Sequence, residues 1–207
     1  MANFVESEQI IYYSYYCCSF VLIRGSVPLF WEQKSITSNL KLSRNIDLTN
    51  AAFVKHFDTL TKDYKRVLCV NLMNKIKSEQ VLTDAFENLI QKNNFENIKY
   101  EFFDFHSACK GQKYENLEFL TSKIDEIIDN FKFFAEQIKR DQKILLQQEG
   151  TIRLNCLDCL DRTNVVMTKI AAINFENMMK HMNTNLSLAL GLNFFFINLF
   201  IFLINID

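Results

Sequence analysis

The chain has 207 residues, of which 49% are hydrophobic and 23% are charged, and its formal net charge is −1 at pH 7. A chain of this length can bury a hydrophobic core, and the composition excludes a disordered protein. The net charge also excludes a general attraction to nucleic acid, so any site for an anion has to be built locally.

Strands and helices alternate in the hydrophobic pattern. Short apolar runs bounded by turn residues predict strands, and apolar residues three or four positions apart predict helices. The expected elements, in chain order, are a strand at Ser19–Glu32, a strand at Val67–Asn74, a helix at Glu79–Gln91, a strand at Ile98–His106, a helix at Tyr114–Arg140, a strand at Thr151–Asn155 and a helix after Arg162. This alternation predicts a layered α/β fold.

The segment 186–206 differs from the rest of the chain because it has no charged residue. About 20 apolar residues are enough to cross a bilayer, so this tail is a candidate transmembrane helix. It also contains Gly191 and three asparagines, and a buried helix or a tail foreign to the domain are the alternatives. We therefore expect a domain at 1–185 followed by an apolar tail at 186–206.

The stretch TIRLNCLDCLDRTNVV, residues 151–166, places Cys156 and Arg162 six positions apart between a predicted strand and a predicted helix. A loop that ends at a helix N-terminus directs backbone N–H groups at an anion such as a phosphate ester. Arg162 can hold two phosphoryl oxygens, and the same field favours the thiolate of Cys156. The pattern therefore predicts a nucleophile at Cys156 and a phosphate ligand at Arg162.

A leaving alkoxide needs a proton, and carboxylates lie on both sides of the predicted loop. Asp158 has two roles open to it, a general acid or a scaffold that orders loop amides. Asp161 is expected mainly as a scaffold. Asp104 and His106 end the predicted strand at Ile98–His106 and could reach the same pocket.

The pair Cys156 and Cys159 has a spacing that two other chemistries also use. Zinc would need a further ligand pair, and no second cysteine pair and no histidine pair at ligand spacing accompanies this one. A thioredoxin-type redox pair is the other alternative because the cysteines precede a helix. The irregular spacing of the six cysteines does not fit a secreted disulfide framework, which favours a reducing compartment.

The residues around the loop resemble the signature of the Sac family of phosphoinositide phosphatases, Arg-x-Asn-Cys-x-Asp-Cys-Leu-Asp-Arg-Thr-Asn. The matching positions are Arg153, Asn155, Cys156, Asp158, Cys159, Leu160, Asp161, Arg162, Thr163 and Asn164. Further blocks that resemble the family are SFVLIRGSVPLFWEQ at Ser19–Gln33, HFD at His56–Asp58, VNLMN at Val70–Asn74 and FDFH at Phe103–His106. The resemblance extends from about Ala2 to Met179.

The resemblance implies Cys156 as the nucleophile, Arg162 as the phosphate ligand and Asp158 as the acid or loop organiser. Contacts to substrate are expected from Asn155, Cys159, Leu160, Asp161, Arg162, Thr163 and Arg24. The implied fold is a mixed β-sheet flanked by helices, as the catalytic half of a Sac-type domain whose N-terminal subdomain is missing.

The resemblance also implies the reaction. The expected substrate is the lipid phosphatidylinositol 4-phosphate, hydrolysed without a metal or other cofactor at a membrane surface, on the cytoplasmic face of the endoplasmic reticulum or Golgi. No nucleic acid partner is expected. Three alternatives stay open: an inactive phosphoinositide-binding fragment, a phosphatase for the 3,5-bisphosphate, and a protein tyrosine phosphatase. For a bisphosphate, Lys55, Lys65 and Arg66 are the candidate ligands of the second phosphate.

Overall fold

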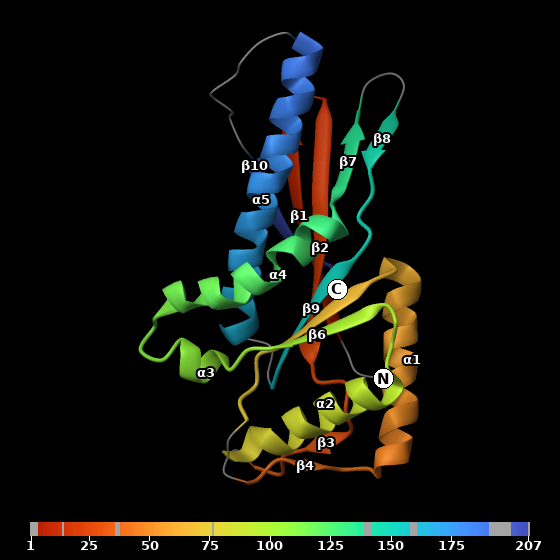
Figure 1. The fold of residues 1–207 in the computed structure, drawn as a ribbon, viewed down its shortest axis with the longest axis vertical. Helices are drawn as coiled ribbons and strands as arrows, with labels where there is room; N and C mark the ends of the chain where they lie inside the picture. The colour runs from red at the N-terminus through yellow and green to blue at the C-terminus, as the bar shows by residue number, and fades with distance from the viewer. Residues whose placement is uncertain are drawn as a thin grey trace.

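The computed structural model describes residues 4–13, 15–35, 38–75, 77–138, 142–157, 161–190 and 200–206. A mixed β-sheet runs through the centre of the molecule, and helices cover both of its faces (Figure 1). The α/β fold with a mixed, helix-flanked sheet that the sequence predicted is confirmed.

The sheet has the strand order β10-β1-β2-β9-β5-β6, with β7 and β8 joined to β2 as a side branch. β9 lies parallel to both β2 and β5, and β5 lies parallel to β6, while the remaining pairs are antiparallel. The strands are β1 (Phe4–Tyr13), β2 (Tyr16–Ser26), β5 (Val67–Asn71), β6 (Ile98–Phe102), β7 (Phe134–Gln137), β8 (Lys143–Leu146), β9 (Thr151–Cys156) and β10 (Phe200–Ile206). A separate two-stranded sheet pairs β3 (Trp31–Glu32) with β4 (Lys41–Leu42).

Two hydrophobic cores lie on opposite faces of the sheet because successive strand residues point to opposite sides. In β5, Val67 and Cys69 pack toward α1 (Ile46–Tyr64) and α2 (Gln80–Asn93), where phenylalanines from both helices meet. Leu68 and Val70 pack toward the other layer. That layer consists of α3 (Phe105–Ala108), α4 (Leu117–Phe131) and α5 (Asp161–Leu190) (Figure 1). β5 and β9 are buried at every position; β5 begins with four apolar residues, whereas β9 alternates apolar residues with the buried polar residues Thr151, Arg153 and Asn155.

The strands expected at Ser19–Glu32 and Val67–Asn74 end earlier, at Ser26 and Asn71. In two further places, part of the predicted element is replaced by an element of the other type. The helix expected at Tyr114–Arg140 ends at Phe131, because Lys132 adopts a positive φ of 55° and Phe134–Gln137 then pairs with β2 as a strand. The strand expected at Ile98–His106 ends at Phe102 and is followed by α3. In both places, tertiary pairing or a side-chain cap decided the local structure.

The apolar tail divides between two elements. Residues 186–190 continue α5, and residues 200–206 form β10, a strand paired with β1 where a helix was expected. Residues 191–199 lie outside the described part of the chain. Among the described residues, no helix has the length and apolar character needed to cross a membrane. Membrane insertion of the tail stays a prediction.

Candidate active site

The candidate site lies at the carboxyl ends of the parallel strands β5 and β9, the edge at which open α/β sheets commonly bind ligands. β9 ends at Cys156, and α5 begins at Asp161, so Cys156 and Arg162 stand at the two ends of one short connection. Asp158, Cys159 and Leu160, which were expected to take part in catalysis and substrate binding, lie outside the described residues. Their roles stay predictions.

Cys156 is fully buried at the end of β9, and its Sγ atom lies 3.9 Å from the hydroxyl oxygen of Thr163. Thr163 was expected to contact the substrate, and in the structure it lies in the first turn of α5, which begins at Asp161. The hydroxyl is therefore placed beside the sulfur. A hydroxyl in this position can donate a hydrogen bond to a thiolate.

Other described cysteines have environments that suppress the thiolate. Burial raises the pKa of Cys18 and of Cys69 to about 12. Burial also raises the pKa of Cys17 and of Cys109. A thiol of raised pKa stays protonated at neutral pH and is a poor nucleophile, so none of these four is a candidate nucleophile.

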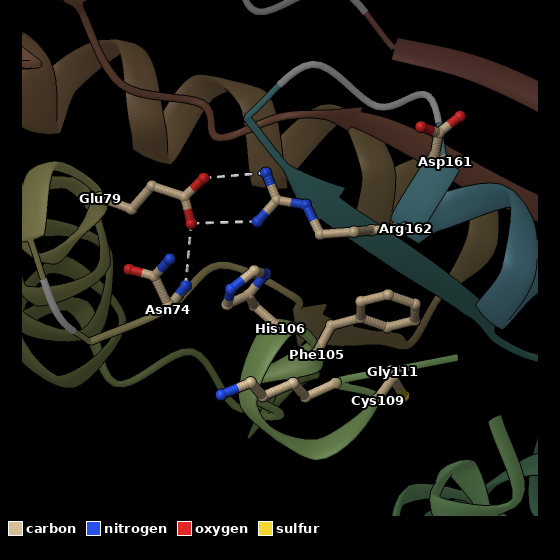
Figure 2. Close-up of a pocket in the computed structure, with 9 residues that line it drawn as sticks. Asn74, Glu79, Phe105, His106, Cys109, Gly111, Asp161 and Arg162 are labelled. Carbon is tan, nitrogen blue, oxygen red and sulfur yellow. Dashed lines mark hydrogen bonds and ion pairs between the residues drawn. The ribbon is translucent and has the colours of Figure 1, made fainter. Parts of the chain in front are cut away.

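Arg162 forms a bidentate ion pair with Glu79, which the sequence analysis did not identify as a site residue. Its Nη1 and Nη2 atoms lie 3.0 Å and 2.8 Å from the two carboxylate oxygens (Figure 2). Glu79 ends a 3₁₀ turn, Lys77–Glu79, just before α2. Acidic residues are common at the start of a helix because the helix dipole favours negative charge there. The sequence position of Glu79 therefore did not indicate a partner 83 residues away.

A cavity of about 410 Å³ opens in front of this ion pair. Its described lining comes from three elements: Arg162 and Asp161 from α5, Asn74 and Glu79 from the β5–α2 connection, and Phe105, His106, Cys109, Lys110 and Gly111 from α3 and the turn after it. In Figure 2, the side chain of Asp161 points away from the Arg162–Glu79 pair, and His106 lies close below that pair. The cavity is therefore polar, with groups of both charges around the guanidinium.

Of the two residues expected to reach the pocket from the third strand, His106 lines the cavity and Asp104 does not. Asp104 instead caps α3, where its Oδ1 atom accepts a hydrogen bond from the backbone N–H of Ser107 at 2.9 Å. The side chain of His106 is exposed on the first turn of that helix.

Arg24 and Asn155, two further expected substrate contacts, are absent from the described lining of this cavity. Arg24 donates from Nη1 to Oδ1 of Asn164, at 3.1 Å, on the first turns of α5. Asn155 is fully buried in the protein interior. Its amide donates to Oδ1 of Asn71 at 2.9 Å, and its own oxygen accepts from Arg153 at 3.2 Å.

Arg153 is the centre of this buried network, although the sequence analysis named it only as a motif position. It is fully buried, and its guanidinium also donates to Nε2 of His56 at 3.0 Å and to the carbonyl of Ser26 at 2.8 Å. Burial, with the positive charge of Arg153 as the second cause, lowers the pKa of His56 to about 3. The imidazole is therefore neutral at physiological pH and can accept this hydrogen bond. The network supports β9 directly before Cys156.

The cations proposed for a second phosphate include residues far from Cys156. The carbonyl of Arg66 accepts a hydrogen bond from the N–H of Thr151 at 2.9 Å, which places Arg66 and its neighbour Lys65 at the opposite end of β9. Five strand steps separate Thr151 from Cys156, a distance of about 16 Å. The guanidinium of Arg66 also contacts the carbonyls of Asn130 and Glu149. Arg66 therefore makes structural contacts within the chain, and its assignment to a second phosphate stays a prediction.

Comparison with known proteins gives one family match and several relatives. The family described as the SacI homology domain matches residues 1–110. The chain is 37% identical over 183 residues to phosphatidylinositide phosphatase SAC2 of Danio rerio, covering 87% of this chain and 16% of that protein. It is 37% identical over 187 residues to phosphatidylinositol-3-phosphatase SAC1-B of Danio rerio, covering 87% of this chain and 31% of that protein.

A third relative is synaptojanin-1 of Homo sapiens, 37% identical over 199 residues, with 93% of this chain and 12% of that protein covered. The chain thus spans between 12% and 31% of the length of these relatives.

Proposed function

This chain belongs to the SacI homology domain family, whose relatives named above include phosphoinositide phosphatases, and we propose that it hydrolyses phosphatidylinositol 4-phosphate through a phosphocysteine at Cys156. The observation that carries the proposal is the placement of Cys156 and Arg162 at the two ends of one strand-to-helix connection. A thiol and a guanidinium so placed can contact the same phosphate.

The proposed reaction has two steps. The thiolate of Cys156 attacks phosphorus, an S–P bond forms, and the bond from phosphorus to the inositol oxygen breaks with a proton supplied to that oxygen. Water then attacks phosphorus and gives up a proton to the group that donated one in the first step; the S–P bond breaks, which releases inorganic phosphate and restores the thiolate. Arg162 holds phosphoryl oxygens in both steps, and the hydroxyl of Thr163 stabilises the sulfur when it leaves.

The proton donor comes from a short set of candidates. Asp158 retains the two roles predicted for it, a general acid or an organiser of the loop. Asp161 and His106 both line the cavity, although Asp161 points away from Arg162. A general acid has to come within hydrogen-bond reach of the leaving oxygen, which favours His106 over Asp161 as the second candidate.

The charge of the described cavity supports a monophosphate as the preferred substrate. Glu79 offsets the charge of Arg162, and the lining also holds one further residue of each charge, Asp161 and Lys110. A headgroup with two phosphates would need further cations, and Arg66 and Lys65 belong to the other end of β9. The named relatives include a 3-phosphatase, so the position of the phosphate on the ring needs a direct test.

The proposed location is a membrane surface on the cytoplasmic face of the endoplasmic reticulum or Golgi. The substrate is a lipid, so the cavity has to approach a bilayer. The irregular spacing of the six cysteines in the sequence fits a reducing compartment.

Phosphate release from the full set of short-chain phosphoinositides and from a phosphotyrosine peptide tests this proposal. We expect the fastest release from phosphatidylinositol 4-phosphate. Faster release from the 3,5-bisphosphate would move the protein to that substrate, and faster release from the peptide would indicate a protein tyrosine phosphatase. Lipid binding without any release would identify an inactive binding fragment.

A further inference from the structure

The contact between Glu79 and Arg162 has the geometry of a positioning interaction. Two hydrogen bonds of 3.0 Å and 2.8 Å join the carboxylate and the guanidinium (Figure 2), and only 10% and 19% of the two side chains are exposed. A paired contact of this type fixes the plane of the guanidinium as well as its distance. Because the Glu79–Arg162 pair is largely shielded from solvent, it differs from an exposed ion pair, which contributes little to stability.

Glu79 is itself held in place by the connection between β5 and α2. Its Oε2 atom accepts a hydrogen bond from the backbone N–H of Asn74 at 3.0 Å. The carbonyl of Asn74 accepts from the hydroxyl of Thr83 at 3.0 Å, which ties the same segment to α2. The carboxylate is therefore anchored to an element that lies across the cavity from α5.

The same connection continues to the strand end beneath the candidate site. The N–H of Met73 donates to Oδ1 of Asn71 at 3.2 Å, and that oxygen also accepts from the amide of Asn155. The Leu72 carbonyl lies 3.4 Å from Nη1 of Arg162. Hydrogen bonds at successive residues of the β5–α2 connection thus join this connection both to the buried end of β9 and to the guanidinium.

Two roles are open to Glu79. It either holds the guanidinium of Arg162 in place, or it blocks the site by competing with phosphate for that guanidinium. A guanidinium can bind two planar partners, one across its two terminal nitrogens and one along its Nε edge. Glu79 uses the terminal nitrogens. A phosphoryl group bound along the Nε edge would not have to displace the carboxylate, and the anchoring of Glu79 by Asn74 favours a fixed support.

We propose that Glu79 is the positioning residue of Arg162, which holds the guanidinium in the orientation that binds the phosphoryl group of the substrate. The proposal rests on the proposed function of Arg162 as the phosphate ligand. It assigns a role in the reaction to a residue from the β5–α2 connection, outside the loop that carries Cys156.

A double-mutant cycle on the 207-residue chain tests the proposal, with short-chain phosphatidylinositol 4-phosphate as substrate and inorganic phosphate as the binding probe. Glu79→Ala should lower kcat/KM by about 10- to 100-fold, since a misplaced binding group has effects of this size. Phosphate affinity should fall as well. In the Arg162→Ala background, the same substitution should add less than about 2-fold, because the residue acts through Arg162.

Two matched variants complete the design. Glu79→Gln keeps the shape and an acceptor for Asn74, so it reports on the lost charge if Glu79→Ala fails to fold. Glu101→Ala removes a carboxylate that pairs with Lys123 at the surface, at 2.7 Å, and should leave kcat/KM unchanged.

The outcomes separate this proposal from the proposed function. Higher activity in Glu79→Ala or Glu79→Gln would identify a block and overturn the proposal. Equal losses with and without Arg162 would also overturn it, because they indicate a general structural role. If the unmodified chain binds phosphate but hydrolyses no phosphoinositide, the proposed function fails and the cycle on phosphate affinity still decides for or against Glu79. If the chain binds no phosphate, both assignments are overturned.

Discussion

The Nε atom of Arg153 donates a hydrogen bond to Nε2 of His56 at 3.0 Å, between two buried side chains. His56 can accept it only as a neutral imidazole with its proton on Nδ1. Burial and the adjacent guanidinium lower the pKa of His56 to about 3, far below the ordinary histidine value of 6.5. The fold therefore depends on a histidine whose imidazole stays neutral, with a single proton on Nδ1.

Acid should destabilise the protein through His56. Below about pH 6.5 the unfolded histidine takes up a proton that the folded one refuses, so the stability present above that pH is lost as the pH falls toward 3. One such group lowers the free energy of unfolding by up to about 1.4 kcal/mol per pH unit. Urea unfolding between about pH 6.5 and pH 5, above the usual carboxyl range, measures the slope.

His56→Gln is the control for this pH dependence, because glutamine offers an acceptor and does not titrate in this range. Burial also lowers the pKa of His181, which adds to the slope in the same direction. The variant should therefore retain only the smaller His181 contribution. An unchanged slope in His56→Gln would show that His56 is not the group responsible.

Arg153→Met should cost about 3 kcal/mol of stability or more. The substitution leaves His56, the Asn155 side chain and the Ser26 carbonyl without a buried donor, and lost partners of this kind are expensive. Lys92→Met is the comparison, since Lys92 and Asp47 form an exposed pair at 4.0 Å whose loss should cost less than about 0.5 kcal/mol. Similar unfolding midpoints for the two variants would refute the role of Arg153 as a buried support.

Gly150→Ala should destabilise the start of β9 by about 1 to 3 kcal/mol, because the added methyl group would overlap the ring of Phe131. The variant Phe131→Leu should relieve part of that cost when the two substitutions are combined. At Gly111 the added methyl meets no atom within 4 Å among the described residues, but φ is +71°, so Phe131→Leu should not rescue Gly111→Ala. Additive losses for Gly150→Ala and Phe131→Leu would contradict the overlap.

The uncharged tail offers a test of membrane attachment. Residues 186–206 have the length and composition of a membrane span, whereas 200–206 pair with β1 in the structure. We predict that the expressed chain stays in the membrane fraction after carbonate extraction. Release into the soluble fraction, with equal release of a chain that lacks 191–207, would remove this prediction.

The sequence carried most of the information on the sheet interior and little on the ends of helices. β5 was predictable because its first four residues form a short apolar run, as in a strand buried on both faces, and β9 because polar and apolar residues alternate along it. β7 was missed because Phe131 to Ala135 continues the apolar pattern of the preceding helix. The helix ends at Lys132, a residue type with no preference for the positive φ that it adopts, so no local signal marked the end.

In the candidate site, too, some contacts could be predicted from the sequence and others could not. Cys156, Thr163 and Arg162 are close in sequence, and one strand-to-helix motif was enough to predict that they flank the same connection, where Thr163 contacts Cys156. The ion pair between Glu79 and Arg162 joins residues that are 83 positions apart in the chain. The hydrogen bond between Asn71 and Asn155 joins residues that are 84 positions apart. Such pairs depend on which strands lie side by side, and a single sequence does not contain that information.

The most direct test of the central claim is single-turnover phosphate release from short-chain phosphatidylinositol 4-phosphate by the unmodified chain, Cys156→Ser and Arg162→Ala, with phosphate binding measured alongside. We expect Cys156→Ser to release no phosphate but to bind it nearly as well as the unmodified chain, because the serine hydroxyl is a far weaker nucleophile than a thiolate. Arg162→Ala should lose both release and binding. Near-normal release from Cys156→Ser would contradict the account.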